Sequence, residues 1–275
     1  NKPTVRWLSN YIENTIKEQY TGIAPIEKKK YYMLSSAQKR LYFLQQMDNT
    51  GTAYNISAAW LLEGIIDRCK LEDIFVRMVK RHESLRTSFA FISEEPVQRI
   101  HDEAEFEIEY KNIATDQHGQ TQTFLNNFIH PFDLSKAPLL RVGLVKLKED
   151  KHLFLVDMHH IISDGMSTQV LVQDFLALYS GKELPEMKLQ FKDYVEWQNQ
   201  ERVSKKILEQ GEYWKKEYDG EIPVLDLPTD YARPSVQYFE GDRINFEISQ
   251  EISAALKAFV KETGTTLYIV LLASY

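Results

Sequence analysis

Two apolar, β-rich runs lie next to each other in the second half of the chain, at residues 139–147 and 152–159. The residues between them, 148–151, are all charged, which predicts a hairpin with a solvent-exposed turn. Both runs are apolar along most of their length, so we expect both strands to be buried. The fold is therefore expected to contain a sheet whose hairpin is covered.

The pattern changes from strand to helix after Asp164. Apolar residues then recur at helical spacing as far as Gly181, which is placed to end that helix. Similar patterns predict helices at 37–47, 67–82, 121–129, 191–200 and 208–218, and strands at 54–62, 85–91, 97–101 and 106–110. These elements mix rather than strictly alternate, and 43% of the residues are hydrophobic. We therefore expect an α/β fold of the mixed α+β kind.

Polar and proline-containing stretches divide the chain into segments. The expected segments are a tail helix at 1–20 with its apolar stripe over 3–20, a linker at 21–30, a main lobe at 31–222, a connector at 223–240 and a second lobe at 241–275. The chain begins with Asn1, so we expect it to be cut from a longer protein.

The second lobe is expected to be unfinished. A strand is predicted at 242–248, followed by helices that start near Ser249 and Thr265. Residues Leu267 to Leu272 would then lack packing partners, so we expect this end of the chain to fold only marginally.

Charge and cysteine content exclude several classes of protein. The chain has 33 Lys and Arg against 40 Asp and Glu, a formal net charge of −7, which disfavours nucleic acid as a partner. The short basic run Lys28–Lys30 is interpreted as a solvated linker. Cys69 is the single cysteine, which excludes an internal disulfide and favours the cytoplasm. No apolar run approaches the ~20 residues that span a bilayer, so no membrane segment is expected.

The most concentrated chemistry lies at His159, His160, Asp164 and Gly165, where the second buried strand gives way to a helix. Because side chains alternate along a strand, the two histidines are expected to point in opposite directions. An imidazole there can accept or donate a proton near neutral pH, as acyl transfer to an amine requires. Asp164 would cap the helix or hold an arginine. Gly165 would let the backbone pass close to a substrate or adopt a conformation that a side chain forbids.

Other interpretations of this cluster stay open on these residues alone. The histidine pair could simply fill space and bind backbone groups, or His160 and Asp164 could be metal ligands, although the segment supplies no convincing third ligand. The sequence has no Gly-x-Ser-x-Gly elbow, phosphate-binding loop or dinucleotide glycine pattern. This favours a reaction in which two substrates react directly with each other while the protein orients them and handles protons.

Three ordered motifs resemble those of nonribosomal peptide synthetase condensation domains. His159 to Gly165 resembles the His-His-x-x-x-Asp-Gly signature of that family. The first motif is matched by Ser35 or Ser36, Ala37, Gln38, Arg40, Leu41, Tyr42 and Leu44, and the second by Arg81, His82, Glu83, Leu85, Arg86, Thr87 and Phe89. Further agreement comes from Pro131, Phe132, Asp133, Leu134, Pro138, Leu139, Arg141, Tyr194 and Trp197. The resemblance spans about residues 31–275.

The resemblance implies a fold similar to chloramphenicol acetyltransferase, in which two related lobes surround a tunnel. This chain would supply the complete N-terminal lobe and the start of the C-terminal lobe. The implied activity is amide bond formation, in which the amine of an acceptor aminoacyl thioester attacks the carbonyl of a donor acyl or peptidyl thioester, as in peptide antibiotic biosynthesis. No cofactor is bound directly, because phosphopantetheine arrives on upstream and downstream peptidyl carrier domains, beside an adenylation domain. The first helix, from Pro3 through Glu13, resembles the last helix of such a carrier, which implies the L-to-L subtype.

The resemblance also implies roles for individual residues. His160 matches the essential second histidine, which deprotonates or orients the amine, and His159 matches a largely structural position. Asp164 resembles the residue that ion-pairs with an arginine, for which Arg86 is our first choice and Arg81 our second. Gly165 would offer its backbone amide to a substrate. The substrate tunnel is expected to include Met166, where a tryptophan is common, Ser167 and Gln38.

Three alternatives compete with a condensation domain. An epimerisation domain shares the fold and the histidine motif, but Gln38 and Arg40 in the first motif speak against it. A related acyltransferase that uses coenzyme A is disfavoured by the carrier-like helix. A docking or recruitment module would keep the fold without catalysis, which an intact set of His160, Asp164 and Gly165 disfavours. The fragment alone could also be inactive, because walls of the tunnel would be missing.

Overall fold

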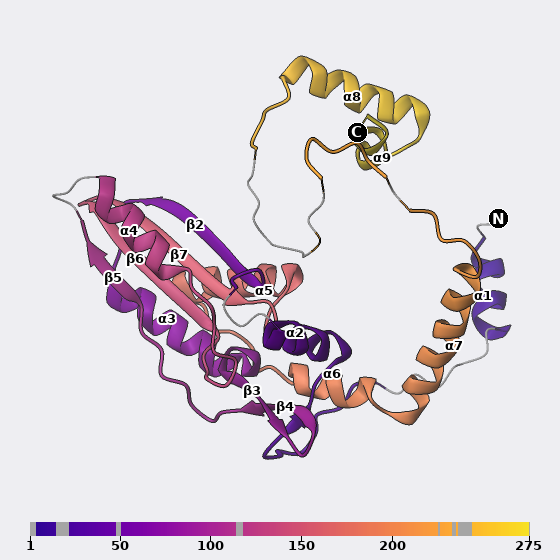
Figure 1. Cartoon of the computed structure of the whole chain (residues 1–275), viewed down its shortest axis with the longest axis horizontal. Helices are drawn as coiled ribbons and strands as arrows, with labels where there is room; N and C mark the ends of the chain where they lie inside the picture. The colour runs from indigo at the N-terminus through magenta and orange to yellow at the C-terminus, as the bar shows by residue number, and fades with distance from the viewer. Residues whose placement is uncertain are drawn as a thin grey trace. The chain divides into compact units, whose positions relative to one another are not determined.

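The chain divides into two compact units, Asn1–Val224 and Leu225–Tyr275. The structure is a computed structural model that describes residues 4–14, 22–47, 51–113, 118–224, 226–232, 235 and 244–274 (Figure 1).

A four-stranded sheet forms the centre of the first unit. Its strands are β2 (Asn55–Glu63), β5 (Glu109–Asn112), β6 (Leu140–Lys148) and β7 (Lys151–His159), in the order β2-β7-β6-β5. The predicted hairpin is confirmed, because β6 and β7 pair antiparallel from Leu140 opposite Met158 to Lys148 opposite Lys151. β5 runs parallel to β6, and β2 runs antiparallel to β7. The mixed helix and sheet content confirms the predicted fold class.

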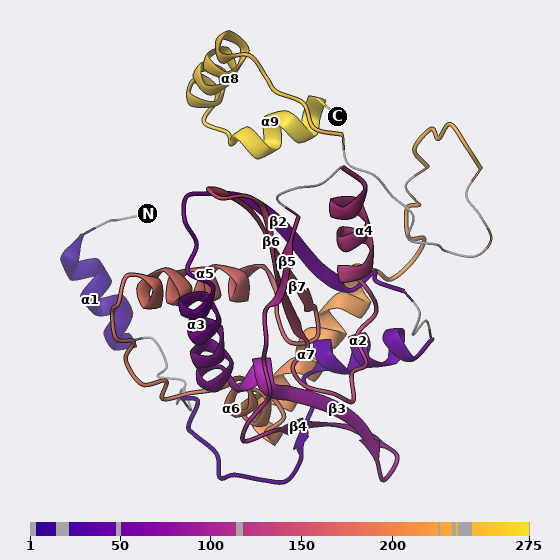
Figure 2. The ribbon, with the colours of Figure 1, turned by 90° about the vertical axis from the view of Figure 1, so that its left-hand side faces the viewer.

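Helices cover both faces of this sheet (Figure 2). On one face lie α3 (Arg68–Arg81) and α5 (Gly165–Tyr179). The apolar side chains of α3 are buried there as the helical spacing predicts, namely Leu71, Ile74, Phe75, Met78 and Val79. The other face packs against α4 (His118–Phe128) in a smaller core of Ile113, Phe128, Val145 and Leu155. The hairpin is therefore buried on both sides.

A glycine in β6 allows α4 to approach the sheet closely. A Cβ placed on Gly143 would lie 2.9 Å from Cε2 of Phe128, shorter than a van der Waals contact. The absence of a side chain at Gly143 thus lets the Phe128 ring lie directly on the strand.

A second, three-stranded sheet has the order β1-β4-β3, with β1 (Tyr32–Met33), β3 (Thr87–Ile92) and β4 (Glu95–Ile100). It neighbours α2 (Ser36–Met47) and the 3-10 helix η1 (Glu83–Arg86) in the chain. The strand predicted at 85–91 begins later, at Thr87, because Leu85 and Arg86 belong to η1. The strand predicted at 106–110 lies at 109–112, and Phe106 instead stacks on Phe75 of α3.

Three further helices complete the described part of the first unit: α1 (Val5–Asn14), α6 (Phe191–Gln198) and α7 (Glu201–Glu217). The predicted tail helix over 3–20 is described only as α1, since residues 1–3 and 15–21 lie outside the described residues. Its apolar side chains Val5, Leu8 and Tyr11 are exposed.

The second unit contains α8 (Gln250–Thr263) and α9 (Leu267–Ser274). Ser249 caps α8 by accepting from the Ile252 N–H, as predicted, and Gly264 ends it in the left-handed conformation at φ 64°. The strand predicted at 242–248 is wrong for the described residues 244–248, which pair with no other strand that the structure describes. The apolar side chains of α9 are largely exposed. No helix in the described ranges is long and apolar enough to cross a bilayer.

Candidate functional site

The two adjacent histidines have opposite environments. His159, the last residue of β7, is fully buried, whereas His160 begins the following turn and is exposed. The backbone N–H of His160 donates to the Tyr54 carbonyl at 2.8 Å, which fixes the turn to the start of β2. The difference in exposure agrees with the alternation expected along a strand.

Both ring nitrogens of His159 are engaged within the protein. Nδ1 accepts from the Ile161 N–H at 3.0 Å, and Nε2 lies 3.3 Å from Oε1 of Gln45. Because Nδ1 accepts, Nε2 carries the proton that it donates to Gln45. Burial, helped by the nearby His160, lowers the pKa of His159 to about 4. The ring is therefore neutral at neutral pH and holds the turn together.

Asp164 acts as the N-cap of α5. Its Oδ1 accepts from the backbone N–H and from Oγ of Ser167, both at 2.7 Å. These two hydrogen bonds lower the pKa of Asp164 below its ordinary value. The carboxylate at this helix N-terminus is thus a local structural group.

The expected ion pair between Asp164 and Arg86 or Arg81 is wrong for the described residues. Arg86 lies in η1, where it donates to the carbonyl of His101 and approaches Glu83 at 3.6 Å. Arg81 ends α3, which packs along α5, so its guanidinium meets Asp174 in the middle of α5, at 2.9 Å. Both arginines therefore bind partners other than Asp164.

Gln38 connects the first motif to the histidine turn. Its buried amide accepts from the Ser35 N–H at 3.1 Å and donates to the Ile161 carbonyl at 3.4 Å. Ser35 in turn caps α2 by accepting from the Gln38 N–H at 3.1 Å. Although Gln38 lines the cavity described below, both ends of its amide already bind backbone.

The first residues of α5 differ in what they offer. Gly165 has no left-handed φ, and among the described atoms none lies within 4 Å of a Cβ placed on it, so neither strain nor crowding by the chain requires glycine here. Met166 is 67% exposed, and Ser167 is used by Asp164.

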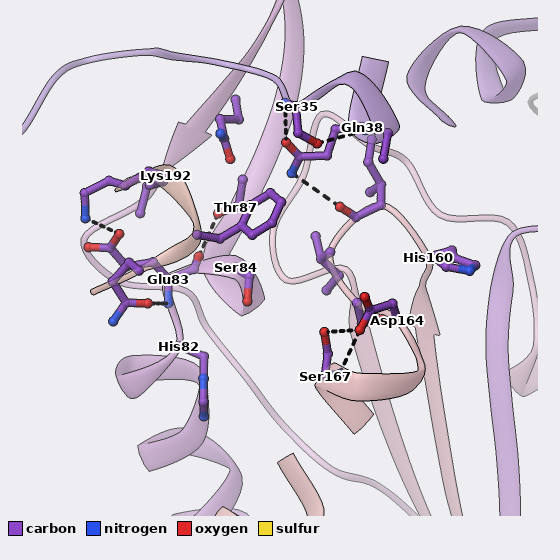
Figure 3. A pocket seen from close by; sticks show the side chains of 18 of the residues that line it. Ser35, Gln38, His82, Glu83, Ser84, Thr87, His160, Asp164, Ser167 and Lys192 are labelled. Carbon is purple, nitrogen blue, oxygen red and sulfur yellow. Dashed lines mark hydrogen bonds and ion pairs between the residues drawn. The ribbon is translucent and has the colours of Figure 1, made fainter. Parts of the chain in front are cut away.

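A cavity of about 380 Å³ joins all of these segments (Figure 3). Its walls come from the start of α2, from η1, from the turn at 160–164 and from residues 187–192. In Figure 3 the His160 ring lies on the opposite side from the ion pair formed by Glu83 and Lys192. One cavity thus collects residues from all three sequence motifs.

Residues 190–192 were missed as part of this site. Gln190 accepts from the Glu83 N–H at 3.2 Å and donates to the Arg81 carbonyl at 3.0 Å, and Lys192 pairs with Glu83. The local signal, a helix start at Phe191, predicted the element but not its partners, since these contacts join residues more than a hundred positions apart.

The site contains the exposed imidazole of His160 and the ion pair between Glu83 and Lys192. Among the described residues, no group of three or more His, Cys, Asp or Glu side chains is placed to hold a metal ion. Such an arrangement can move a proton and orient a polar substrate at His160.

Comparisons with known proteins agree with these motifs. The family model described as "Condensation domain" matches residues 28–275. Gramicidin S synthase 2 of Brevibacillus brevis is 47% identical over 273 residues, which cover 99% of this chain and 6% of that protein. Tyrocidine synthase 2 of Brevibacillus parabrevis is 45% identical over 274 residues, covering 100% of this chain and 8% of that protein. The chain thus spans only a small part of these curated relatives.

Solved structures share the fold. The X-domain from teicoplanin biosynthesis, in complex with OxyB, matches with a TM-score of 0.67 and 26% identity, over 78% of this chain and 49% of that one. A mutant starter condensation domain of rhizomide synthetase RzmA, in complex with C8-CoA and Leu-SNAC, matches with a TM-score of 0.61 and 21% identity, over 68% of this chain and 45% of that one.

Proposed function

The chain belongs to the condensation-domain family of nonribosomal peptide synthetases, and from that membership we propose that it carries the catalytic half of an L-to-L condensation domain centred on His160. The observation that carries the proposal is the contrast within the histidine pair. His159 is fully buried and bound on both nitrogens, whereas His160 is exposed on the cavity that all three motifs line. Only His160 is thus free to meet a substrate.

The proposed reaction joins two carrier-bound thioesters. The amine nitrogen of the acceptor attacks the carbonyl carbon of the donor, a C–N bond forms, and the C–S bond breaks to release the donor's phosphopantetheine thiol. The nitrogen loses one proton and the departing sulfur gains one. His160 either accepts the proton from the amine or orients the amine by a hydrogen bond.

The neighbouring residues of the turn would hold His160 in place. The cap formed by Asp164 with Ser167 and the bond from Gln38 to the Ile161 carbonyl fix the part of the turn that follows His160, and the bond from the His160 N–H to the Tyr54 carbonyl fixes its start. The Gly165 N–H, at the first position of α5, would donate to a substrate oxygen. Met166 and Ser167 would line the path of the substrate.

Both substrates are proposed to arrive on peptidyl carrier domains upstream and downstream, with an adenylation domain adjacent. Support comes from gramicidin S synthase 2 and tyrocidine synthase 2, in which the matched region is only 6% and 8% of a much longer protein. We further propose that α1 is the last helix of the upstream carrier, that 21–30 is a linker, and that a cytoplasmic location accompanies the single free Cys69.

Recruitment of another protein is the second candidate function. It is favoured by the X-domain relative, which was solved in complex with OxyB. A recruitment module needs no imidazole open to a cavity, so the exposed His160 favours catalysis. An epimerisation domain of the same fold would instead invert an α-carbon without forming an amide.

The test is amide formation by the intact protein with donor and acceptor thioesters loaded on its carriers. His160→Ala should abolish the coupled product seen by mass spectrometry, while His130→Ala, an exposed histidine outside the cavity, should retain it. Coupling that survives in His160→Ala would refute the assignment. Inversion without coupling in the unmodified protein would identify an epimerase.

A further inference from the structure

A single carboxylate on α5, Asp174, binds two consecutive side chains at the end of α3. Arg81 donates from Nε to Oδ2 of Asp174 at 2.9 Å, and Nε2 of His82 lies 2.9 Å from the same oxygen. The three side chains are between 9% and 19% exposed. Removing one member of such an enclosed set leaves another charge poorly compensated.

The protonation of the cluster follows from its geometry. A carboxylate oxygen only accepts hydrogen bonds, so Nε2 of His82 carries a proton and donates it to Asp174. Burial lowers the pKa of His82, against the opposite effect of Asp174. A neutral His82 is therefore sufficient to make this contact, and the charge of Asp174 is balanced by Arg81.

Arg81 also contacts the segment 185–190, part of which lines the cavity wall. Nη1 of Arg81 donates to the Pro185 carbonyl at 2.6 Å. Gln190 bridges the Arg81 carbonyl and the Glu83 N–H at 3.0 and 3.2 Å. A shift of Arg81 would therefore move residues 185–190 together with α5.

Helix α5 links Asp174 to the turn that carries His160. The helix is unbroken from Gly165 to Tyr179, and at 1.5 Å per residue Asp174 lies roughly 15 Å from its N-cap, Asp164. Beside Asp174, the Phe175 ring packs on Phe75 of α3, with centroids 5.6 Å apart. Because the helix is unbroken, a shift of α5 relative to α3 at Asp174 would also shift its first turn.

We propose that Asp174 is a positioning residue: by binding Arg81 and His82 it sets α5 against α3 and so places His160 opposite the cavity wall at 185–190. Arg81 and His82 of the second motif would thus hold α5 through Asp174, and not through Asp164. The consequence for coupling rests on the proposed function, whereas the consequence for the histidine turn does not.

The first test reads the turn without any coupling assay. Diethyl pyrocarbonate modifies accessible histidines, and tandem mass spectrometry locates each modified site. In the intact protein His160 should react while the fully buried His159 is protected. Asp174→Ala should raise the rate at His159 several-fold, and the same rise should occur in the His160→Ala background.

The matched control is Val145→Ala, which opens a cavity in the core on the other sheet face, with Val145 fully buried beside Phe128. Its loss of thermal stability can be matched to that of Asp174→Ala by choice of temperature. At equal stability, Val145→Ala should leave His159 protected. Equal exposure of His159 in both variants would overturn the proposal, since it would reflect general loosening.

The second test reads coupling in the loaded intact protein. Asp174→Asn should lower kcat by about 10- to 100-fold, as misplacement of a reacting group by about 1 Å does, with little change in KM. Arg81→Gln combined with Asp174→Asn removes both partners of the contact and should lower kcat about as much as Asp174→Asn alone. A change confined to KM, or losses in kcat that multiply in the double variant, would contradict positioning. If His160→Ala still couples, the proposed function fails, while the modification test still decides the role of Asp174.

Discussion

The backbone N–H of Ile161 donates to Nδ1 of His159 over 3.0 Å, so a residue two positions later in the chain fixes the tautomer of the buried histidine. The turn folds back on its own first side chain. The neighbouring His160 is exposed at the edge of the cavity, whereas His159 makes the internal contacts of the turn.

The first prediction concerns acid stability. The pKa of His159 is about 4 in the folded protein against 6.5 for the free side chain, so the unfolded state binds the proton first as the pH falls. The free energy of unfolding should therefore fall by about 2 kcal/mol from this residue between pH 7 and pH 5, and stay unaffected by it above pH 7. Urea unfolding at both pH values measures the change.

His159→Asn supplies the control for that measurement, since its side-chain oxygen can accept from the Ile161 N–H without titrating. The decline between pH 7 and pH 5 should become shallower in this variant. An unchanged decline would mean that other groups, such as the buried His82, account for it.

The second prediction concerns the cap of α5. Asp164→Ala removes both contacts to Ser167 and should cost about 0.5–2 kcal/mol of stability. Asp67→Ala removes the equivalent cap of α3, where Asp67 accepts from the Lys70 N–H at 3.1 Å, at a distance from the cavity residues. Thermal melting should show similar losses for both, whereas amide formation should fall further in Asp164→Ala. Equal amide formation by Asp164→Ala and Asp67→Ala would show that Asp164 has no role in the site beyond capping α5.

The third prediction concerns the contact of α4 with the sheet. Gly143→Ala places a Cβ 2.9 Å from the Phe128 ring and should destabilise the protein by about 1–3 kcal/mol. Phe128→Leu added to Gly143→Ala should recover part of that loss. Gly119→Ala in α4, where no described atom lies within 4 Å of the new Cβ, should be neutral or stabilising. Chemical unfolding of the three variants tests the order.

Patterns that are local in the chain predicted their elements well. The hairpin at 140–159, the capped helices α5 and α8 and the buried face of α3 all follow from periodicity and capping residues. The strand predicted at 106–110 was misplaced because Phe106 packs on Phe75 of α3 and does not belong to a strand. Such a distant partner cannot be identified from periodicity.

The candidate site was predictable in part for the same reason. The exposure of His160 and the cap formed by Asp164 depend on neighbours within a few residues. The partners of Arg81 and the contribution of Gln190 depend on how α3, α5 and α6 meet, which no spacing in one segment encodes.

The register that places Asn55 opposite His159 has a consequence for the order in which the protein is made. About a hundred residues separate the paired strands, so β2 leaves the ribosome long before its partner exists. Until then its exposed edge is an open template for other chains. The pairing of β2 with β7 also brings the histidine turn to Tyr54. A chain whose synthesis stops before β7 therefore has neither the complete sheet nor the histidine turn.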